Sequence, residues 1–234
     1  LGWSRGLGDV YKRQSEGNII TVHCPNTGSM KNCLEPNSCC WYSLSSNPKR
    51  KLKGTLEIVT TKYGSLAGVN TARANNLVRT ALETKFITEL SAYDVLKSEI
   101  LYGKEKSRID FLLQDTSGEF PDCYLEVKNV TLDEGNGLAM FPDSVTARGT
   151  KHLRELIFMA EEGFRSVLFF CVQLSDAKSF SIASNIDPVY AGTLNEALNK
   201  GIEIIAWRTL MTSDSIALQM PINVTLDALD QKTR

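Results

Sequence analysis

The sequence predicts an α/β chain (α+β overall), with a β domain at the N-terminus and a larger domain built on a mixed sheet. Short runs of strand-forming residues joined by turns fill the first part of the chain, at 19–23, 39–44 and 55–61. After residue 63, segments with a helical period alternate with strand-like segments. Residues 166–173 are continuously apolar, which is typical of a buried parallel strand.

Composition and charge agree with two unlike domains. The 234 residues are 42% hydrophobic and 23% charged, ordinary values for a globular protein of one large or two small domains. Residues 1–62 hold nine Lys or Arg against four Asp or Glu, a net of +5, whereas residues 63–234 hold seventeen against twenty-three, a net of -6. This charge distribution is typical of a DNA-binding domain joined to a catalytic domain that carries carboxylates. It also occurs in proteins in which the charge difference has no functional role.

The cysteines and the absence of long apolar runs indicate the compartment. The spacings of the six cysteines fit no zinc finger or ribbon, and the only histidines are His23 and His152, so we expect reduced structural thiols. No apolar run approaches the roughly 18 residues that span a bilayer. With no signal peptide either, we expect a cytoplasmic protein without a membrane partner.

The N-terminal strands carry two candidate phosphate contacts. Residues 1–14 have no clear period, so we interpret them as a foreign leader and exclude them from the fold; the first sheet would then lack its opening strand. The turn after residue 23 offers Asn26, Thr27 and Ser29 to phosphates, the alternative being a plain hairpin turn.

A basic loop lies between the second and third of these strands. Its cations are Lys49, Arg50, Lys51 and Lys53, and each one placed at a phosphate would add salt-sensitive affinity for nucleic acid. Trp41 and Tyr42 could add base stacking, although one of them should face the core if the strand alternates. The alternative is a merely solvated loop.

Gly64 to Gly68 marks the domain boundary, and the second domain opens with a helix from Asn70 or Thr71 to about residue 86. A strand is expected at 95–102. Residues 107–113 and 123–129 follow as two antiparallel strands joined by a polar turn.

This hairpin carries charge in its centre. Asp110 interrupts an apolar run, and Glu126 and Lys128 alternate with apolar residues at a period of two, so these two lie on one face. We expect Asp110 to share this sheet surface with them. Carboxylates close together favour a cation such as Mg²⁺ between them, and a neighbouring lysine can orient a water or stabilise charge on a phosphate. The alternative is a solvated strand face with a salt bridge.

The last third predicts a helix at 144–162 stopped by Gly163, a helix at 194–200 closed by Gly201, and a strand at 202–207. Arg148, Lys151 and His152 share one face of the first of these helices, where they could meet a phosphate. His152 could instead be an ordinary surface histidine.

Two resemblances add to this interpretation. Asp110, Glu126 and Lys128 resemble the core of PD-(D/E)xK nucleases, although Ile109 stands where the motif has Pro. Longer stretches are similar to the sugar fermentation stimulation protein A (SfsA) family, in order and with ordinary spacing, at 23–30, 46–52, 68–71, 107–113, 126–131 and 141–156.

The resemblance implies an OB-like β barrel at 15–62, a nuclease-like domain with a mixed central sheet at 63–234, and DNA as the partner. It further implies a metal-dependent DNA endonuclease, in which Asp110 and Glu126 hold Mg²⁺ or Mn²⁺, Lys128 assists, and Arg108 and Arg148 clamp phosphates. Glu83 and Glu99 are accessory acid candidates, each with a surface role as the alternative.

Two other functions stay open at this stage. One is a non-catalytic DNA-binding regulator linked to sugar metabolism, and the other is an enzyme or sensor of sugar metabolism, for which the sequence holds no sugar-specific motif. The sequence implies no protein partner and leaves monomer and homodimer open.

Overall fold

The computed structural model describes residues 9–15, 18–212 and 214–226. Its N-terminal part is a five-stranded sheet in the order β1-β2-β4-β3, with β5 paired to β4. These strands are β1 (Asp9–Ser15), β2 (Asn18–Cys24), β3 (Cys40–Leu44), β4 (Gly54–Thr60) and β5 (Leu66–Gly68).

The ends of this sheet differ from our expectation. Strand β1 pairs antiparallel with β2 and falls within the leader that we excluded, so the described sheet does not begin with β2. The remainder of that leader, residues 1–8, lies outside the described residues. Strand β5 extends the sheet beyond residue 62 because its apolar Ala67 pairs with Val59 of β4.

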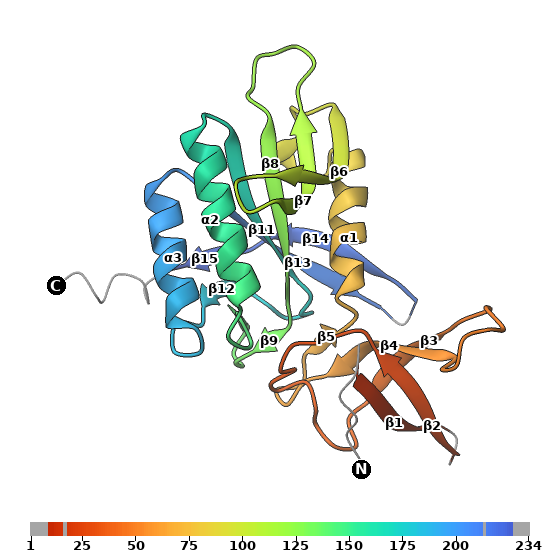
Figure 1. Cartoon of the computed structure of the whole chain (residues 1–234). Coiled ribbons are helices and arrows are strands. Elements are labelled where there is room, and N and C mark those ends of the chain that lie inside the picture. The colour runs from red at the N-terminus through yellow and green to blue at the C-terminus, as the bar shows by residue number, and fades with distance from the viewer. Residues whose placement is uncertain (1–8, 16–17, 213, 227–234) are drawn as a thin grey trace.

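The larger domain is built on a six-stranded mixed sheet in the order β14-β13-β11-β8-β7-β6 (Figure 1). The three central strands β8, β11 and β13 run parallel, and the outer pairings are antiparallel. The strands are β6 (Val95–Tyr102), β7 (Ser107–Gln114), β8 (Cys123–Val130), β11 (Arg165–Val172), β13 (Glu203–Met211) and β14 (Ile216–Pro221).

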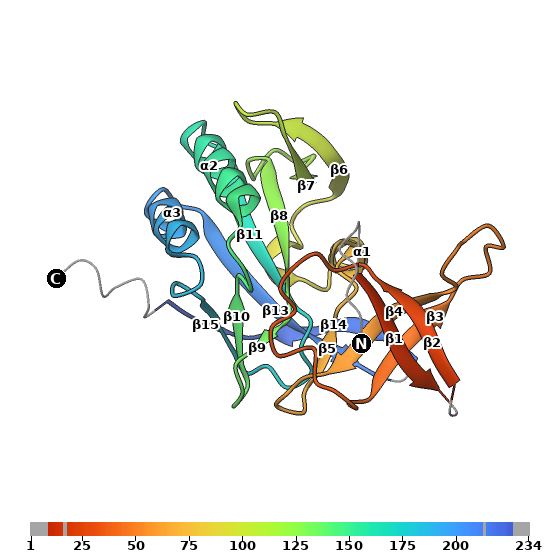
Figure 2. The same ribbon diagram turned by 60° about the horizontal axis from the view of Figure 1, so that its bottom comes forward.

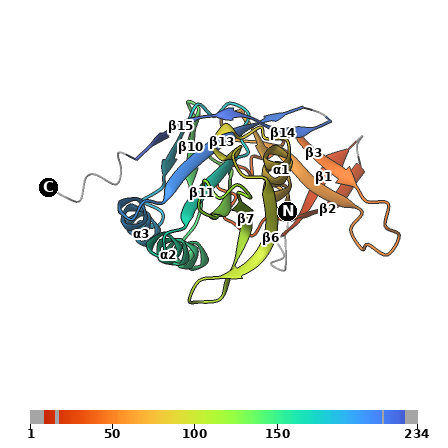
Figure 3. The same cartoon turned by 90° about the horizontal axis from the view of Figure 1, so that it is seen from above.

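Helices cover both faces of this sheet. One face packs against α1 (Ala72–Glu83), and the other against α2 (Ala147–Glu161) and α3 (Pro188–Asn199), as the view from above shows (Figure 3). Strand β11 supplies both cores: Phe169 belongs to the α1 side and Phe170 to the other side. Its unbroken apolar run therefore reflects burial on two faces.

A small second sheet was not predicted. It has the order β15-β12-β10-β9 and joins short segments that are far apart in the chain. Its members are β9 (Leu132–Asp133), β10 (Leu138–Phe141), β12 (Ser179–Ile182) and β15 (Asn223–Thr225), and a short 3-10 helix, η1 (Thr88–Leu90), lies elsewhere. Such short strands carry too few residues to show a period.

Side chains join the two parts of the chain, which lie against each other in Figure 2. The Asp143 carboxylate accepts hydrogen bonds from the Ser29 hydroxyl at 3.2 Å and the Met30 N–H at 3.1 Å. A Cβ at position 28 would come within 2.5 Å of Asp143 Oδ2, so Gly28 permits this close approach. None of the helices in the described part of the chain has the length and apolar content needed to span a bilayer.

Candidate functional site

The candidate site lies where strands β7 and β8 separate. Their ladder runs from Leu113 paired with Cys123 to Phe111 paired with Leu125 and stops there, although both strands continue. The neighbouring β6 is irregular at the same level, because Glu99 has a positive φ of 57°. Beyond Phe111 the backbone groups of β8 are therefore open to side chains.

Asp110 occupies this gap between the strands. Its Oδ2 accepts the Val127 backbone N–H at 2.7 Å, and its Oδ1 accepts the Asn75 amide of α1 at 2.7 Å. Burial, with a further contribution from the negative charge of Glu126, raises the pKa of Asp110 to about 6. This carboxylate is held in place but is costly to ionise.

Glu126 lies on the α2 side of β8 in contact with two basic side chains. Its Oε1 accepts the Lys128 ammonium at 2.7 Å and contacts His152 Nδ1. Burial alone would raise the pKa of Glu126, but Lys128 and His152 outweigh it and hold the pKa below its usual range. Glu126 and Lys128 thus share a face as expected. The expectation that Asp110 shares this face is wrong, because the β7–β8 ladder ends at Phe111 and Asp110 lies in the gap, bonded to Asn75 of α1.

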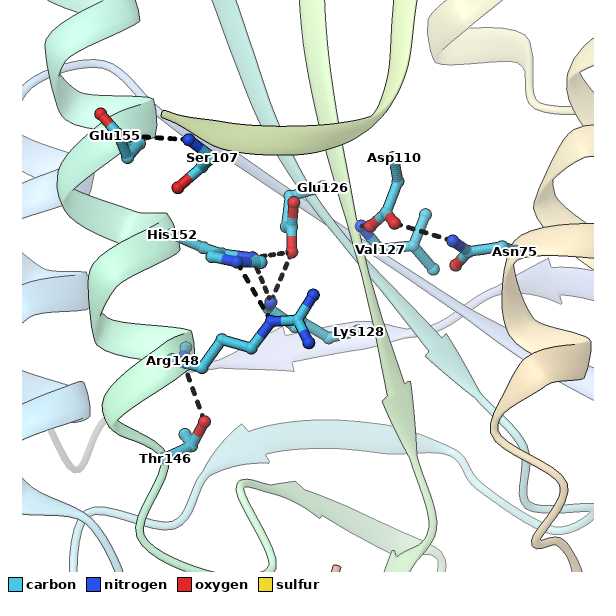
Figure 4. A network of polar contacts seen from close by, with 11 residues as sticks. Asn75, Ser107, Asp110, Glu126, Val127, Lys128, Thr146, Arg148, His152 and Glu155 are labelled. Atoms are coloured by element: carbon cyan, nitrogen blue, oxygen red, sulfur yellow. Dashed lines mark hydrogen bonds and ion pairs between the residues drawn. The ribbon is translucent and has the colours of Figure 1, made fainter. Parts of the chain in front are cut away.

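One oxygen of this cluster has no partner. Glu126 Oε2 is buried and forms no hydrogen bond with any described residue. Figure 4 shows Glu126 with Lys128, His152 and Arg148 on the α2 side, and Asp110 with Asn75 on the α1 side. A buried, ionised oxygen without a partner is costly, and a water or a cation would satisfy it.

The carboxylates of the site fit a hard divalent ion that takes only one or two of its ligands from the protein. Among the described residues, no group of three or more His, Cys, Asp or Glu side chains forms a metal cage. Mg²⁺ commonly uses one or two carboxylates together with waters and substrate phosphates. Asp110 and Glu126 could supply those carboxylates, and the orphaned Glu126 Oε2 is the observation that favours them.

The candidate residues of α2 lie in two different places, the site itself and the β6–β7 hairpin region. Arg148 is exposed, and its Nε lies 3.4 Å from His152 Nε2, so both belong to the site; His152 itself is buried. Lys151 instead donates to the Glu105 carbonyl at 2.9 Å, and Arg108 donates to the Glu99 carbonyl at 3.0 Å. These last two cations contact the backbone of the β6–β7 hairpin region.

The accessory acids lie outside this cluster. Glu83 forms only a long 4.0 Å ion pair with Arg79, and both side chains are exposed. Glu99 is exposed at the irregular point of β6. The helix position that does contact the site is Asn75, which the apolar stripe of α1 did not single out.

The candidate phosphate contacts of the N-terminal sheet are split as well. Lys49, Lys51 and Lys53 are exposed on the β3–β4 loop, while Arg50 donates to the Thr55 hydroxyl at 2.6 Å. In the turn after β2, Asn26 is buried and Thr27 and Ser29 are exposed. Asn26 and Thr27 line a pocket of about 240 Å³, whose other lining residues include Asn129, Thr131, Leu132, Met140, Phe141 and Asp143.

Glu155 is a further buried carboxylate beside the site that the sequence did not mark. It accepts the backbone N–H groups of Lys104, Glu105 and Ser107 at 2.7, 2.9 and 3.3 Å. It thereby fixes the turn that opens β7, the strand that carries Asp110. Its helical spacing of three from His152 is the one sequence signal that relates it to the site.

Comparison with known proteins agrees with this two-part architecture. Residues 4–69 match the SfsA N-terminal OB domain, and residues 72–215 match the sugar fermentation stimulation protein RE domain. The chain belongs to the SfsA family. The N-terminal sheet is accordingly OB-like, and the sheet with its three helices is the second SfsA domain.

Individual SfsA proteins match over nearly the whole chain. A sugar fermentation stimulation protein homolog of Saccharophagus degradans is 53% identical over 205 residues, which cover 88% of this chain and 86% of the relative. The homolog of Pseudomonas savastanoi pv. phaseolicola is 48% identical over 227 residues, covering 96% and 93%. The structure of Pyrococcus furiosus SfsA in complex with Ca²⁺ matches with a TM-score of 0.82 and 25% identity, covering 95% and 94% of the two chains.

Proposed function

We propose that this SfsA-family protein binds DNA and cleaves phosphodiester bonds with the help of a divalent cation. The observation that carries the proposal is Glu126, a buried and ionised carboxylate with one oxygen unpartnered, placed beside Lys128 and the Asp110 gap. The Ca²⁺ complex of the Pyrococcus furiosus relative supports a divalent ion, and we infer Mg²⁺ or Mn²⁺ as the active one.

The DNA partner is supported by the N-terminal sheet. OB folds commonly bind oligonucleotides, and here the OB-like sheet carries the basic loop with exposed Lys49, Lys51 and Lys53. Each of these ammonium groups can neutralise a phosphate without reading sequence. The loop therefore supplies affinity, and the second domain supplies chemistry.

Within the site, each side chain has a distinct task. Glu126 is ionised at neutral pH, and Asp110 ionises above about pH 6, so both offer negative oxygens to the ion. When bound, the ion would polarise the phosphate and lower the pKa of a water. Lys128 can stabilise the charge that develops on the phosphate, and the exposed Arg148 can hold a neighbouring phosphate.

The decisive experiment is a cleavage assay with single- and double-stranded DNA in Mg²⁺, Mn²⁺ and chelator, beside a gel-shift titration in Ca²⁺. Asp110→Asn should abolish cleavage while DNA affinity holds or rises, because one of the two negative charges facing the phosphate is removed. Lys128→Ala should abolish cleavage and leave metal binding largely intact, since an ammonium donates no lone pair. Arg148→Ala should weaken both binding and rate.

A parent that binds DNA but shows no metal-dependent cleavage sensitive to Asp110→Asn would leave a non-catalytic DNA-binding regulator as the function. The basic loop is tested separately. Replacing Lys49 and Lys51 by Ala should weaken binding to all sequences alike and flatten the slope of log affinity against log salt by roughly one unit for each phosphate that is no longer neutralised. An unchanged slope would place the DNA path elsewhere.

We also propose a cytoplasmic location, which the thiols support. Burial raises the pKa of Cys33, Cys123 and Cys171 to about 12, so these thiols stay protonated and unreactive within the core. Such thiols suit a reducing compartment. Cell fractionation with an antibody to the protein tests this, and recovery in an envelope or secreted fraction would contradict it.

A further inference from the structure

A groove outside the candidate site lies between the two domains. It has a volume of about 430 Å³, and strand β3, helix α1 and the turn of the β13–β14 hairpin line it. Figure 1 shows this hairpin reaching down beside β3. The volume is in the range of sites that enclose small organic groups.

One wall of the groove is aromatic because Trp41 projects from β3 on the groove side. Strand β3 alternates, with Cys40 and Tyr42 packed against the core and Trp41 and Ser43 among the residues that line the groove. Trp41 is only half-buried. Among the residues that the structure describes, no other aromatic ring stacks on it.

The facing wall combines apolar and hydrogen-bonding groups. One face of α1 contributes Asn76, Leu77 and Thr80, and the hairpin contributes Ser215 and Ile216. The positions on α1 are spaced by three and four, so their side chains project toward the same side. A planar ligand with apolar faces and a polar edge would find partners for both.

The charge of the groove disfavours phosphate as its occupant. Its buried carboxylate, Glu57, is compensated by Arg73, whose Nε and Nη2 lie 3.1 and 3.0 Å from the two carboxylate oxygens. The other charged residue of the lining is acidic, Asp214. No cation of the lining remains for an anion, so the groove suits an uncharged group better than a phosphate.

The phosphate-binding element lies on the same strand. The loop that carries Lys49 and Lys51 begins where β3 ends, and consecutive strand residues rise about 3.3 Å each. A nucleic-acid strand whose phosphates follow this loop therefore passes within a few nucleotides of the Trp41 ring. The aromatic groove and the neighbouring basic loop together therefore suit a nucleic-acid strand.

We infer that the groove between β3, α1 and the β13–β14 turn binds an unpaired base of single-stranded DNA, stacked on Trp41. The inference rests on the proposed DNA binding and adds the strandedness of the substrate. A paired base exposes only its edges in the duplex grooves, so a site that stacks on a base face requires a single strand.

The test measures affinity in chelator, where no cleavage can occur, with two oligonucleotides of about 12 nucleotides. One is oligo-dT and the other is an abasic strand with the same number of phosphates. Trp41→Ala should bind oligo-dT roughly 5- to 100-fold more weakly than the parent and bind the abasic strand unchanged. Trp41→Phe should retain most of the affinity, and the parent should bind oligo-dT more tightly than a duplex of equal length.

The matched control is Tyr63→Ala, which removes an aromatic side chain of the same domain that is 48% exposed and does not line the groove. It should bind both strands as the parent does. Equal reductions of oligo-dT and abasic binding in Trp41→Ala would overturn the inference, as would a parent that prefers duplex. Self-association of the parent that disappears in Trp41→Ala would show a second copy as the occupant and would also overturn it.

Failure of the proposed function gives a different pattern. A parent with no metal-dependent cleavage, but with base-dependent binding that Trp41→Ala removes, refutes the nuclease and keeps the groove. Cleavage that is normal in the parent, with oligo-dT affinity unchanged in Trp41→Ala, refutes the groove and keeps the nuclease.

Discussion

Two buried glutamates, Glu57 at the domain junction and Glu126 in the candidate site, differ in how their oxygens are satisfied. Glu57 accepts four hydrogen bonds, two at each oxygen, from Ser43, Asn70 and Arg73. Glu126 concentrates its partners on Oε1 and leaves Oε2 with none among the described residues. The hydrogen-bonding capacity of Glu57 is therefore satisfied by protein groups. One oxygen of Glu126 requires a water, an ion or a ligand as its partner.

Hydrogen-bond satisfaction, unlike burial, distinguishes the structural carboxylate of Glu57 from the candidate functional carboxylate of Glu126. Glu57 is 9% exposed and Glu126 is 2% exposed, so exposure alone would rank the candidate site as the more structural of the two. Hydrogen-bond satisfaction gives the opposite order, with Glu57 as the more structural of the two. Buried polar groups without partners are uncommon, and an ionised one is satisfied by a water, an ion or a ligand.

The largest expected effect is on chemistry. Glu126→Gln keeps the shape of the side chain and acceptors for Lys128 and His152 but removes the ionised oxygen, so cleavage should fall by more than about 100-fold. Glu57→Gln should leave the rate per folded molecule at the parent level. Single-turnover cleavage at saturating enzyme measures both, and equal reductions in the two variants would erase the distinction.

The next effect is on stability. Glu57→Gln removes the charge that holds Arg73 and disturbs the hydrogen bonds with Ser43 and Asn70, so it should lower the free energy of unfolding by about 1–3 kcal/mol. The cost is tempered because Arg73 is 48% exposed. Urea unfolding at neutral pH measures it, and a change below about 0.5 kcal/mol would show that the junction does not depend on this carboxylate.

The pH dependence should have opposite signs in the two regions. The pKa of Asp110 is raised to about 6, so its ionisation lowers stability at neutral pH, and this cost begins to fall as the pH drops through 6 and is lost near the unfolded-state pKa of about 3.9. The pKa of Glu57 is lowered: burial acts to raise it, but the hydrogen bonds from Arg73, Ser43 and Asn70 outweigh burial. Its stabilisation is present above the unfolded-state pKa of about 4.3 and is lost in acid.

Unfolding in chelator at several pH values measures these two contributions. From pH 7 to about pH 5, Asp110→Asn should remove a gain of about 1 kcal/mol that the parent shows on acidification. Below about pH 4, Glu57→Gln should unfold less steeply with falling pH than the parent does. Parallel pH profiles in all three proteins would contradict both assignments.

The smallest effect is expected at a third carboxylate, on the surface. Glu105 pairs with Arg154 at 3.0 Å, and the two side chains are 42% and 51% exposed. Glu105→Gln should change the unfolding free energy by less than about 0.5 kcal/mol and leave cleavage unaltered. A larger destabilisation would show that the ion pair supports the neighbouring β6–β7 turn.

The sequence predicted the elements that have a strong period. The hairpin of β7 and β8, the buried β11 and the helices around Leu77 and Leu153 lie where their apolar patterns placed them. Helix α3, expected at 194–200, begins earlier, at Pro188, because Asp187 caps it. The strands of the small sheet, such as Leu132–Asp133, pair only through distant parts of the chain, so no local pattern marks them.

The composition of the site was predicted better than its geometry. The period of two brings Glu126 and Lys128 together, but it cannot show that the β7–β8 ladder ends at Phe111 and leaves Asp110 in the gap. Helical spacing brings His152 to the sheet, yet its burial against Glu126 depends on how α2 packs. Asn75 and Glu155 reach the site only through the tertiary fold.

The position of β8 within the central sheet has a consequence for synthesis of the chain. In the sheet, β8 lies between β7 and β11. The ribosome synthesises β7 before β8, but it synthesises β11, residues 165–172, only later. Until then β8 is the open edge of a nascent sheet, and charged side chains on such an edge oppose pairing with other chains. Glu126 and Lys128 should therefore oppose aggregation of the growing polypeptide, and light scattering of translation-arrested chains should increase when both residues are made apolar.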